Sequence, residues 1–123
     1  MHRDLKPANI LIGRSKLDQS TIYLIDFGLA KKWNQASNIS HNENTNKVVG
    51  TAIYAGINAH ITGSQYYKKD DLESMMYVLC YLGTGMLPWK NCKPNEAGLD
   101  KMMKMKIKIS PYDLFSTLSQ EFA

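Results

Sequence analysis

The sequence predicts a mainly α fold of the α+β kind, with one short β-hairpin near the N-terminus and a buried central helix. Two short apolar runs, residues 10–12 and 21–25, flank a stretch rich in turn formers, which is typical of a small hairpin. Farther along, apolar residues recur at helical spacing between Asp70 and Leu82. The chain has 123 residues, 44% of them hydrophobic, which fits one globular domain.

A long polar segment follows the hairpin. Residues 33–47 ("WNQASNISHNENTNK") are rich in Asn and carry almost no apolar side chain, so they add little to a core. We therefore expect a mobile surface loop there.

The central helix is predicted from about Asp70 to Leu82. Asp70 is a suitable N-cap, with Glu73 three residues on in a box-like arrangement. Apolarity extends most of the way round this helix, which is typical of a buried one. Residues 83–85 (Gly-Thr-Gly) are expected to end it. The residues at helical spacing are Leu72, Met75, Met76, Leu79 and Leu82.

The segment "LDKMMKMKIKIS" at residues 99–110 alternates Lys with Met and Ile. Such a pattern is typical of a surface helix with one packed side and solvated lysines. The alternative is a basic amphipathic segment for a membrane or a calmodulin-like partner.

Net charge, cysteine content and the lack of a long apolar stretch indicate which partners and which cellular compartment to expect. The net charge of +4 suits phosphate-bearing substrates, but it is too small and scattered to indicate nucleic-acid binding. Charged residues rather than an apolar run follow Met1, and no apolar stretch approaches the roughly 20 residues that span a bilayer. We expect an intracellular protein, cytoplasmic or nuclear, with no membrane span. Cys80 and Cys92 are expected to be free thiols, with a single disulfide as the alternative.

One group of polar residues is of the kind that catalyses a reaction. His2-Arg3-Asp4 is followed by Asn9, and Asp26-Phe27-Gly28 comes directly after the second short strand. The combination of "HRDLKPAN", a strand-turn-strand and "DFG" resembles the catalytic loop and the metal-binding loop of protein kinases.

Phosphoryl transfer needs these residue types. A carboxylate must orient the attacking hydroxyl or accept its proton, which suits Asp4. Magnesium prefers oxygen ligands, here the carboxylate of Asp26 and the amide oxygen of Asn9. The ammonium group of Lys6 can reach the phosphate that is transferred.

The resemblance narrows to the C-terminal lobe of the casein kinase 1-like family of serine/threonine kinases. "IDFGLAKKW" (25–33), "GTAIYAGINAH" (50–60) and "KKDDLESMMYVLCYLGTGMLPW" (68–89) are similar to that family's segments. "INAH" stands where most kinases carry Ala-Pro-Glu. The similarity extends over roughly residues 2–110.

This resemblance implies a role for each site residue. The catalytic residues are Asp4 as base, Lys6, Arg3, and Thr51, which hydrogen-bonds the base and the lysine. Lys6, Asn9 and Asp26 bind the cofactors ATP and Mg²⁺, with Asn9 and Asp26 as the metal ligands. Arg3 pairs with an anionic group of the polar loop in many kinases. Asp71 is implied to accept backbone N–H bonds from the catalytic loop. Further structural support comes from His2, Phe27 and Gly28.

The sequence departs from the family at Ile53, where an Arg in "GTARYA" grips phosphate on primed substrates. An Ile cannot bind an anion, so a preference for phosphorylated substrates is not expected.

Residues 1–123 are thus predicted to be a partial protein kinase domain, comprising the catalytic loop, "DFG", the activation segment and the central helix. The Gly-rich loop, the strand lysine and the helix glutamate of a kinase N-lobe precede the "HRD" segment, and only Met1 does so here. The isolated chain is therefore expected to be inactive. A missing N-lobe or a covering partner is implied.

The sequence leaves three functions open. The first is a casein kinase 1-like enzyme that phosphorylates Ser and Thr of protein substrates. The second is a non-catalytic kinase lobe that binds substrates or scaffolds another kinase. The third is a small-molecule phosphotransferase, which "HRDLKP" and "GTAIYAGINAH" together disfavour.

Overall fold

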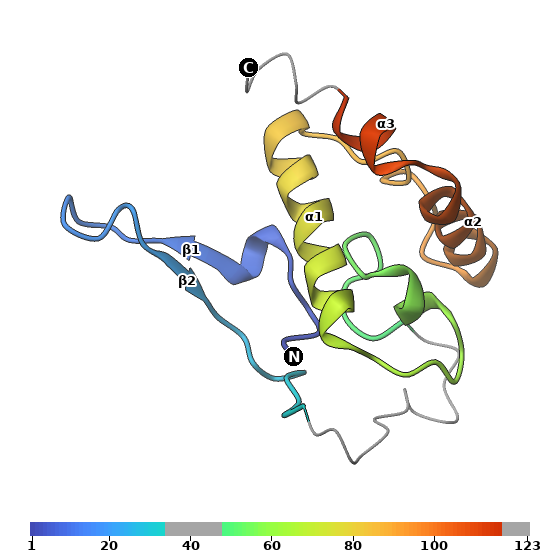
Figure 1. Cartoon of the computed structure of the whole chain (residues 1–123), viewed down its shortest axis with the longest axis horizontal. Helices are drawn as coiled ribbons and strands as arrows, with labels where there is room; N and C mark the ends of the chain where they lie inside the picture. The colour runs from blue at the N-terminus through green and yellow to red at the C-terminus, as the bar shows by residue number, and fades with distance from the viewer. Residues whose placement is uncertain (34–47, 117–123) are drawn as a thin grey trace.

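The computed structural model describes residues 1–33 and 48–116. Within these ranges a long central helix separates a β-hairpin, which projects to one side, from a C-terminal helical layer (Figure 1). The segment that leads into the central helix lies between it and the C-terminal layer (Figure 1). The elements are η1 (Pro7–Asn9), β1 (Ile10–Ile12), β2 (Ile22–Leu24), η2 (Ile57–His60), α1 (Lys68–Thr84), α2 (Glu96–Lys108) and α3 (Pro111–Phe115).

The predicted hairpin is confirmed. β1 and β2 pair antiparallel, with Ile10 opposite Leu24. One residue beyond this pair, the N–H of Ile25 donates to the carbonyl of Asn9 over 3.0 Å. The base of the hairpin therefore brings Asn9 beside the residues that follow β2.

The predicted central helix is confirmed as α1, but it begins earlier than expected. Its N-cap is Tyr67, and Asp70 lies three residues inside the helix, so the assignment of Asp70 as N-cap is wrong. The carboxylate of Asp70 instead accepts from the N–H of Tyr67 over 2.6 Å. At the other end Gly85, with φ of 71°, closes the helix as the glycine-containing stop predicts.

The expectation that this helix is buried most of the way round is wrong. Its buried residues are Asp70, Ser74, Tyr77, Val78 and Cys80. Asp70 accepts from the amide of Asn58 in η2 over 2.9 Å, and Tyr77 and Cys80 belong to the main core. The other face is open among the described residues. The side chains on that face are Leu72, Met76, Leu79 and Leu82, with 68%, 44%, 50% and 59% exposed.

The main core lies on the buried side of α1. Trp89 is fully enclosed at its centre, and its ring meets that of Tyr77 edge-on, with centroids 4.9 Å apart. Cys80 is part of this core, and both cysteines are free thiols as expected. The core residues are Tyr77, Cys80, Leu87, Trp89, Met102 and Leu114.

α2 is a surface helix with one packed side, as the favoured interpretation of residues 99–110 predicts. Met102 is buried, and Lys104 and Lys108 are exposed. Lys106 is the exception to the expected solvated lysines, since its side chain is only 3% exposed. It lies one helical turn after Met102, on the same packed face.

The buried side chain of Lys106 lies against His60, which is partly buried. The ammonium nitrogen lies 3.1 Å from Nε2 of His60. Burial lowers the pKa of Lys106 to about 7, against the opposing effects of Glu73 and Cys92.

The folded protein is expected to lose stability in weak acid because of His60. Burial, and then the nearby ammonium of Lys106, lower the pKa of His60 to about 4 from 6.5. As the pH falls below 6.5 the unfolded chain takes up a proton that the folded chain does not, so the free energy of unfolding decreases until about pH 4. Allowing for partial exposure, we expect a loss on the order of 1–2 kcal/mol.

Urea unfolding at about pH 7 and about pH 4.5 measures this loss. His60→Gln, which keeps an acceptor near Lys106 and does not titrate, should show a smaller pH dependence. An equal loss of stability in both proteins would show that His60 is not the group responsible.

No helix within the described ranges is long and apolar enough to cross a bilayer. The polar loop predicted at residues 33–47 lies almost wholly outside the described residues, since only Trp33 belongs to them.

Candidate active site

The catalytic loop is shaped by a single turn of 3-10 helix. Pro7 stands at its first position, where a fixed φ suits the turn and a missing N–H costs nothing. The N–H of Asn9 closes the turn on the carbonyl of Lys6 over 2.9 Å. This turn directs the buried side chain of Asn9 back to Asp4, whose backbone carbonyl accepts from Nδ2 over 2.9 Å.

The carboxylate of Asp4 is held on both oxygens. Oδ2 lies 2.8 Å from the ammonium of Lys6. Oδ1 accepts from both the N–H and the hydroxyl of Thr51, over 2.8 and 2.7 Å. Lys6 also donates to the Thr51 hydroxyl over 3.2 Å, so the three side chains form a closed set.

These contacts determine the charge of Asp4. Partial burial raises its pKa, but the hydrogen bonds from Lys6 and Thr51 and the charge of Lys6 outweigh that effect. The pKa of Asp4 therefore lies below its ordinary value, and the group is ionised at neutral pH.

Asp71 of α1 fixes the start of the loop. Its carboxylate accepts from the N–H of His2 over 2.7 Å and from the N–H of Arg3 over 2.9 Å. Arg3 has φ of 68°, a conformation that costs a non-glycine residue about 1–3 kcal/mol. The two charge-assisted bonds help to offset that strain. They are the bonds that the family resemblance implies for Asp71.

The side chain of Arg3 makes a contact that the sequence did not predict. Its Nε donates to the carbonyl of Leu29 over 2.6 Å, which connects the loop to the residues after "DFG". In many kinases Arg3 would pair with an anionic group of the polar loop; here residues 34–47 of that loop lie outside the described residues, and the pairing stays a prediction.

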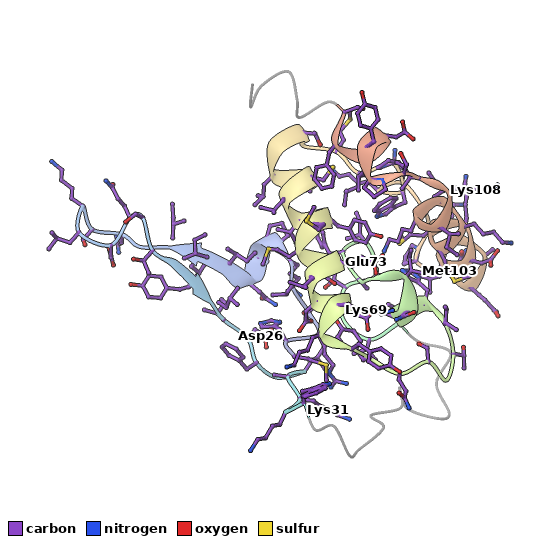
Figure 2. The ribbon with its side chains drawn as sticks, in the orientation of Figure 1. Asp26, Lys31, Lys69, Glu73, Met103 and Lys108 are labelled. Atoms are coloured by element: carbon purple, nitrogen blue, oxygen red, sulfur yellow. The ribbon has the colours of Figure 1, made fainter. Side chains whose placement is uncertain are left out.

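His2 joins the loop to the segment "DFG". One ring nitrogen, Nε2, lies 3.0 Å from the carbonyl of Ile25, and the ring packs at 5.2 Å from that of Phe27. Asp26 has φ of 62°, a left-handed conformation that Asp adopts more readily than most residues. The N–H of Gly28 approaches its Oδ1 at 3.3 Å. Asp26 thus follows β2 on an exposed bend (Figure 2).

The comparison with known families agrees with this geometry. A family model described as the protein kinase domain matches residues 1–123. The chain belongs to the protein kinase domain family. Members of this family transfer phosphoryl groups and generally use ATP and Mg²⁺.

The donor set of this kinase domain fits magnesium. Asn9 uses its amide nitrogen as donor to Asp4, which leaves its amide oxygen available to a metal, and Asp26 offers an exposed carboxylate. No group of three or more His, Cys, Asp or Glu side chains that could bind a metal occurs among the described residues. Magnesium does not need one, because it is commonly bound by one or two protein oxygens together with water and substrate phosphates.

Two residues that contact the site of this kinase domain were not singled out from the sequence. Tyr66 donates its hydroxyl to Oδ1 of Asp71 over 2.8 Å, and no sequence pattern marks it. Gly50 has φ of 82°, and a Cβ there would lie 2.4 Å from the carbonyl oxygen of Arg3. Its place directly before Thr51 was the available signal.

Gly50→Ala is expected to destabilise this kinase domain more than Gly63→Ala. Both glycines have positive φ, 82° and 75°, so each substitution brings a strain of about 1–2 kcal/mol. A Cβ at Gly63 meets nothing within 4 Å, whereas one at Gly50 collides with backbone of the catalytic loop. We expect an additional loss of about 1–3 kcal/mol for Gly50→Ala, measured by urea unfolding. Equal losses would show that the loop tolerates displacement there.

Proposed function

We propose that the chain is the catalytic part of a serine/threonine protein kinase of the casein kinase 1-like family, which transfers the γ-phosphate of ATP to Ser and Thr hydroxyls of proteins. The observation that supports it most is the attachment of Lys6 and Thr51 to the same carboxylate, that of Asp4. It pairs an ionised acceptor for a hydroxyl proton with a cation that can meet the transferred phosphate.

Each residue then has a role in the transfer. Asp4 orients the substrate hydroxyl and takes its proton as the oxygen bonds to the γ-phosphorus. The bond to the oxygen that bridges the β- and γ-phosphates breaks, and ADP leaves. Lys6 balances the charge on the transferred group, and Thr51 keeps the carboxylate in place. Asn9 and Asp26 would hold Mg²⁺, which would supply positive charge to the phosphates.

The narrower family assignment is supported by "GTAIYAGINAH" and by the segment that forms α1. Ile53 belongs to the first of these and packs against the main core. Because its side chain offers no donor, we propose substrates that need no prior phosphorylation for recognition at this position.

A nucleotide-binding lobe completes this site in the proposal, either from the same polypeptide or from a partner. The open face of α1 supports a covering element, since Leu72, Leu79 and Leu82 are half or more exposed there. The same observation favours the second candidate function, a non-catalytic lobe that binds another kinase or a substrate.

Phosphoamino acid analysis tests the proposal. The natural gene product, purified from its source, is incubated with γ-labelled ATP, Mg²⁺ and an acidic protein such as casein, beside the isolated 123-residue chain. We expect labelled phosphoserine and phosphothreonine with the natural product and no transfer by the isolated chain. Label on tyrosine would contradict the serine/threonine assignment. A natural product that transfers no phosphate but stays bound to another kinase or to a substrate protein would favour the binding function.

A further inference from the structure

Lys106 of α2 is buried against the activation segment. Its ammonium nitrogen lies 2.8 Å from the carbonyl oxygen of Ala52 and 2.6 Å from that of Ala55. The ammonium also lies over the rings of Tyr77 and Trp89, with centroids 5.1 and 5.3 Å away. Together with His60, these groups enclose it almost completely.

The two carbonyls belong to one tight turn. The N–H groups of Tyr54 and Ala55 both donate to the carbonyl of Thr51, over 2.9 and 3.0 Å. Within the turn, the carbonyl of Ile53 accepts from Nε1 of Trp89 over 2.8 Å. The carbonyls of residues 52, 53 and 55 are therefore all held by buried side-chain donors that come from beyond α1.

The opposite end of the same turn is the catalytic site. Thr51, its first residue, donates twice to Oδ1 of Asp4. Gly50, just before it, approaches the backbone of Arg3 too closely for a side chain. A turn of five residues thus joins Lys106 to the carboxylate of Asp4, with contacts at both ends.

We propose that Lys106 is a positioning residue for phosphoryl transfer: by holding the carbonyls of Ala52 and Ala55 it keeps Thr51 on the carboxylate of Asp4. This inference rests on the proposed function, and it extends the machinery of the site to α2.

The chemistry of the position supports a role beyond packing. An apolar side chain such as Met, which occupies position 102 on the same face, is less costly to bury than an ammonium. The buried ammonium of Lys106 is compensated by three acceptors and two aromatic faces. Glu73 of α1 supplies the largest attractive charge at Lys106, and its Oε2 accepts from the N–H of Ile57 over 3.1 Å.

Amide exchange in the 123-residue chain tests the positioning directly. In the wild-type chain we expect the Thr51 amide to be protected by its bond to Asp4. Lys106→Met should speed its exchange by about 10-fold or more, because the turn is released. Lys108→Met is the matched control. It removes the same charge from an exposed position on the outer side of α2 (Figure 2), and it should leave the exchange unchanged. Unchanged Thr51 exchange in folded Lys106→Met would overturn the proposal.

A second measurement covers the case in which Lys106→Met does not fold. In the wild-type chain at about pH 5.5, a buried, hydrogen-bonded ammonium should give a slowly exchanging 15Nζ resonance with contacts to Ala52 and Ala55. Rapid exchange of that resonance would overturn the proposal in the same way.

Kinetics of the natural gene product separate this inference from the proposed function. Lys106→Met should lower kcat by about 10- to 100-fold with KM for ATP little changed, and Lys106→Arg, which keeps charge and donors, should restore part of the rate. An unchanged kcat would overturn the positioning role. If the wild-type product transfers no phosphate, the proposed function fails with the catalytic part of this inference, while the exchange data still decide whether Lys106 holds Thr51.

Discussion

Asp4→Asn is expected to lower phosphoryl transfer by the natural gene product by at least about 100-fold. The amide has nearly the shape of the carboxylate, so Lys6 and Thr51 keep a neighbour of the same size. It cannot take the proton of the attacking hydroxyl, and it places an NH₂ group where Oδ1 or Oδ2 now accepts hydrogen bonds. The loss should appear in kcat, because the group acts in the transition state rather than in ATP binding.

The comparison is made at neutral pH. The pKa of Asp4 lies below its ordinary value, so the wild-type group is ionised there and the variant is neutral. Asp100→Asn is the matched control, because it makes the same change at an exposed carboxylate whose ion pair is with Lys104. We expect the control to retain nearly the full rate. Full activity of Asp4→Asn would show that Asp4 takes no part in the chemistry and would contradict its role as the base.

The local part of the fold could be predicted from the sequence. Two short apolar runs around a stretch of turn formers located the hairpin within a few residues, and the helical spacing together with Gly85 located α1. The relative placement of Asp4 and Asn9 also follows from the sequence, because Pro7 fixes a turn between them. The hairpin itself brings Asp26 near Asn9, because β2 runs back along β1 to the point where β1 begins.

What could not be predicted depends on contacts between distant segments. Leucines and methionines at helical spacing on α1 indicate a helix, but not which face its neighbours cover. The covered face is the one that carries Tyr77 and Cys80, which pack in the main core with residues of the C-terminal layer. For the same reason the alternating pattern around Lys106 indicates a helix with solvated lysines. It gives no sign that two carbonyls 51 and 54 residues away, and the ring of His60, lie in position to accept from one of them.

In the candidate site, too, some residues could be predicted from the sequence and others could not. Family resemblance named Thr51 and Asp71, which the structure brings to Asp4 and to the N–H groups of His2 and Arg3. Gly50 was not predicted, because the site needs empty space at this position rather than a functional group. Only the approach of the Arg3 carbonyl shows why a side chain is excluded.

Asp71→Asn is expected to reduce both stability and activity, and by more than any exposed carboxylate. Asp71 accepts three hydrogen bonds, from the N–H groups of His2 and Arg3 and from the hydroxyl of Tyr66. An amide side chain has one oxygen, so its NH₂ group must face at least one of these donors. A donor left unpaired in a partly buried place costs about 1–3 kcal/mol, and the charge assistance to the others is lost as well.

The consequence for catalysis follows from the backbone of Arg3. Its positive φ is maintained by surrounding contacts, and the loss of its acceptor allows the residue next to Asp4 to relax. We therefore expect Asp71→Asn to lower the free energy of unfolding by about 2–4 kcal/mol in urea titrations. At temperatures where the variant is folded, it should still lower kcat by about 10-fold or more. Asp100→Asn again serves as the control, with a change of at most about 0.5 kcal/mol. A variant that loses stability but keeps its full kcat would show that Asp71 supports the fold without positioning the catalytic loop.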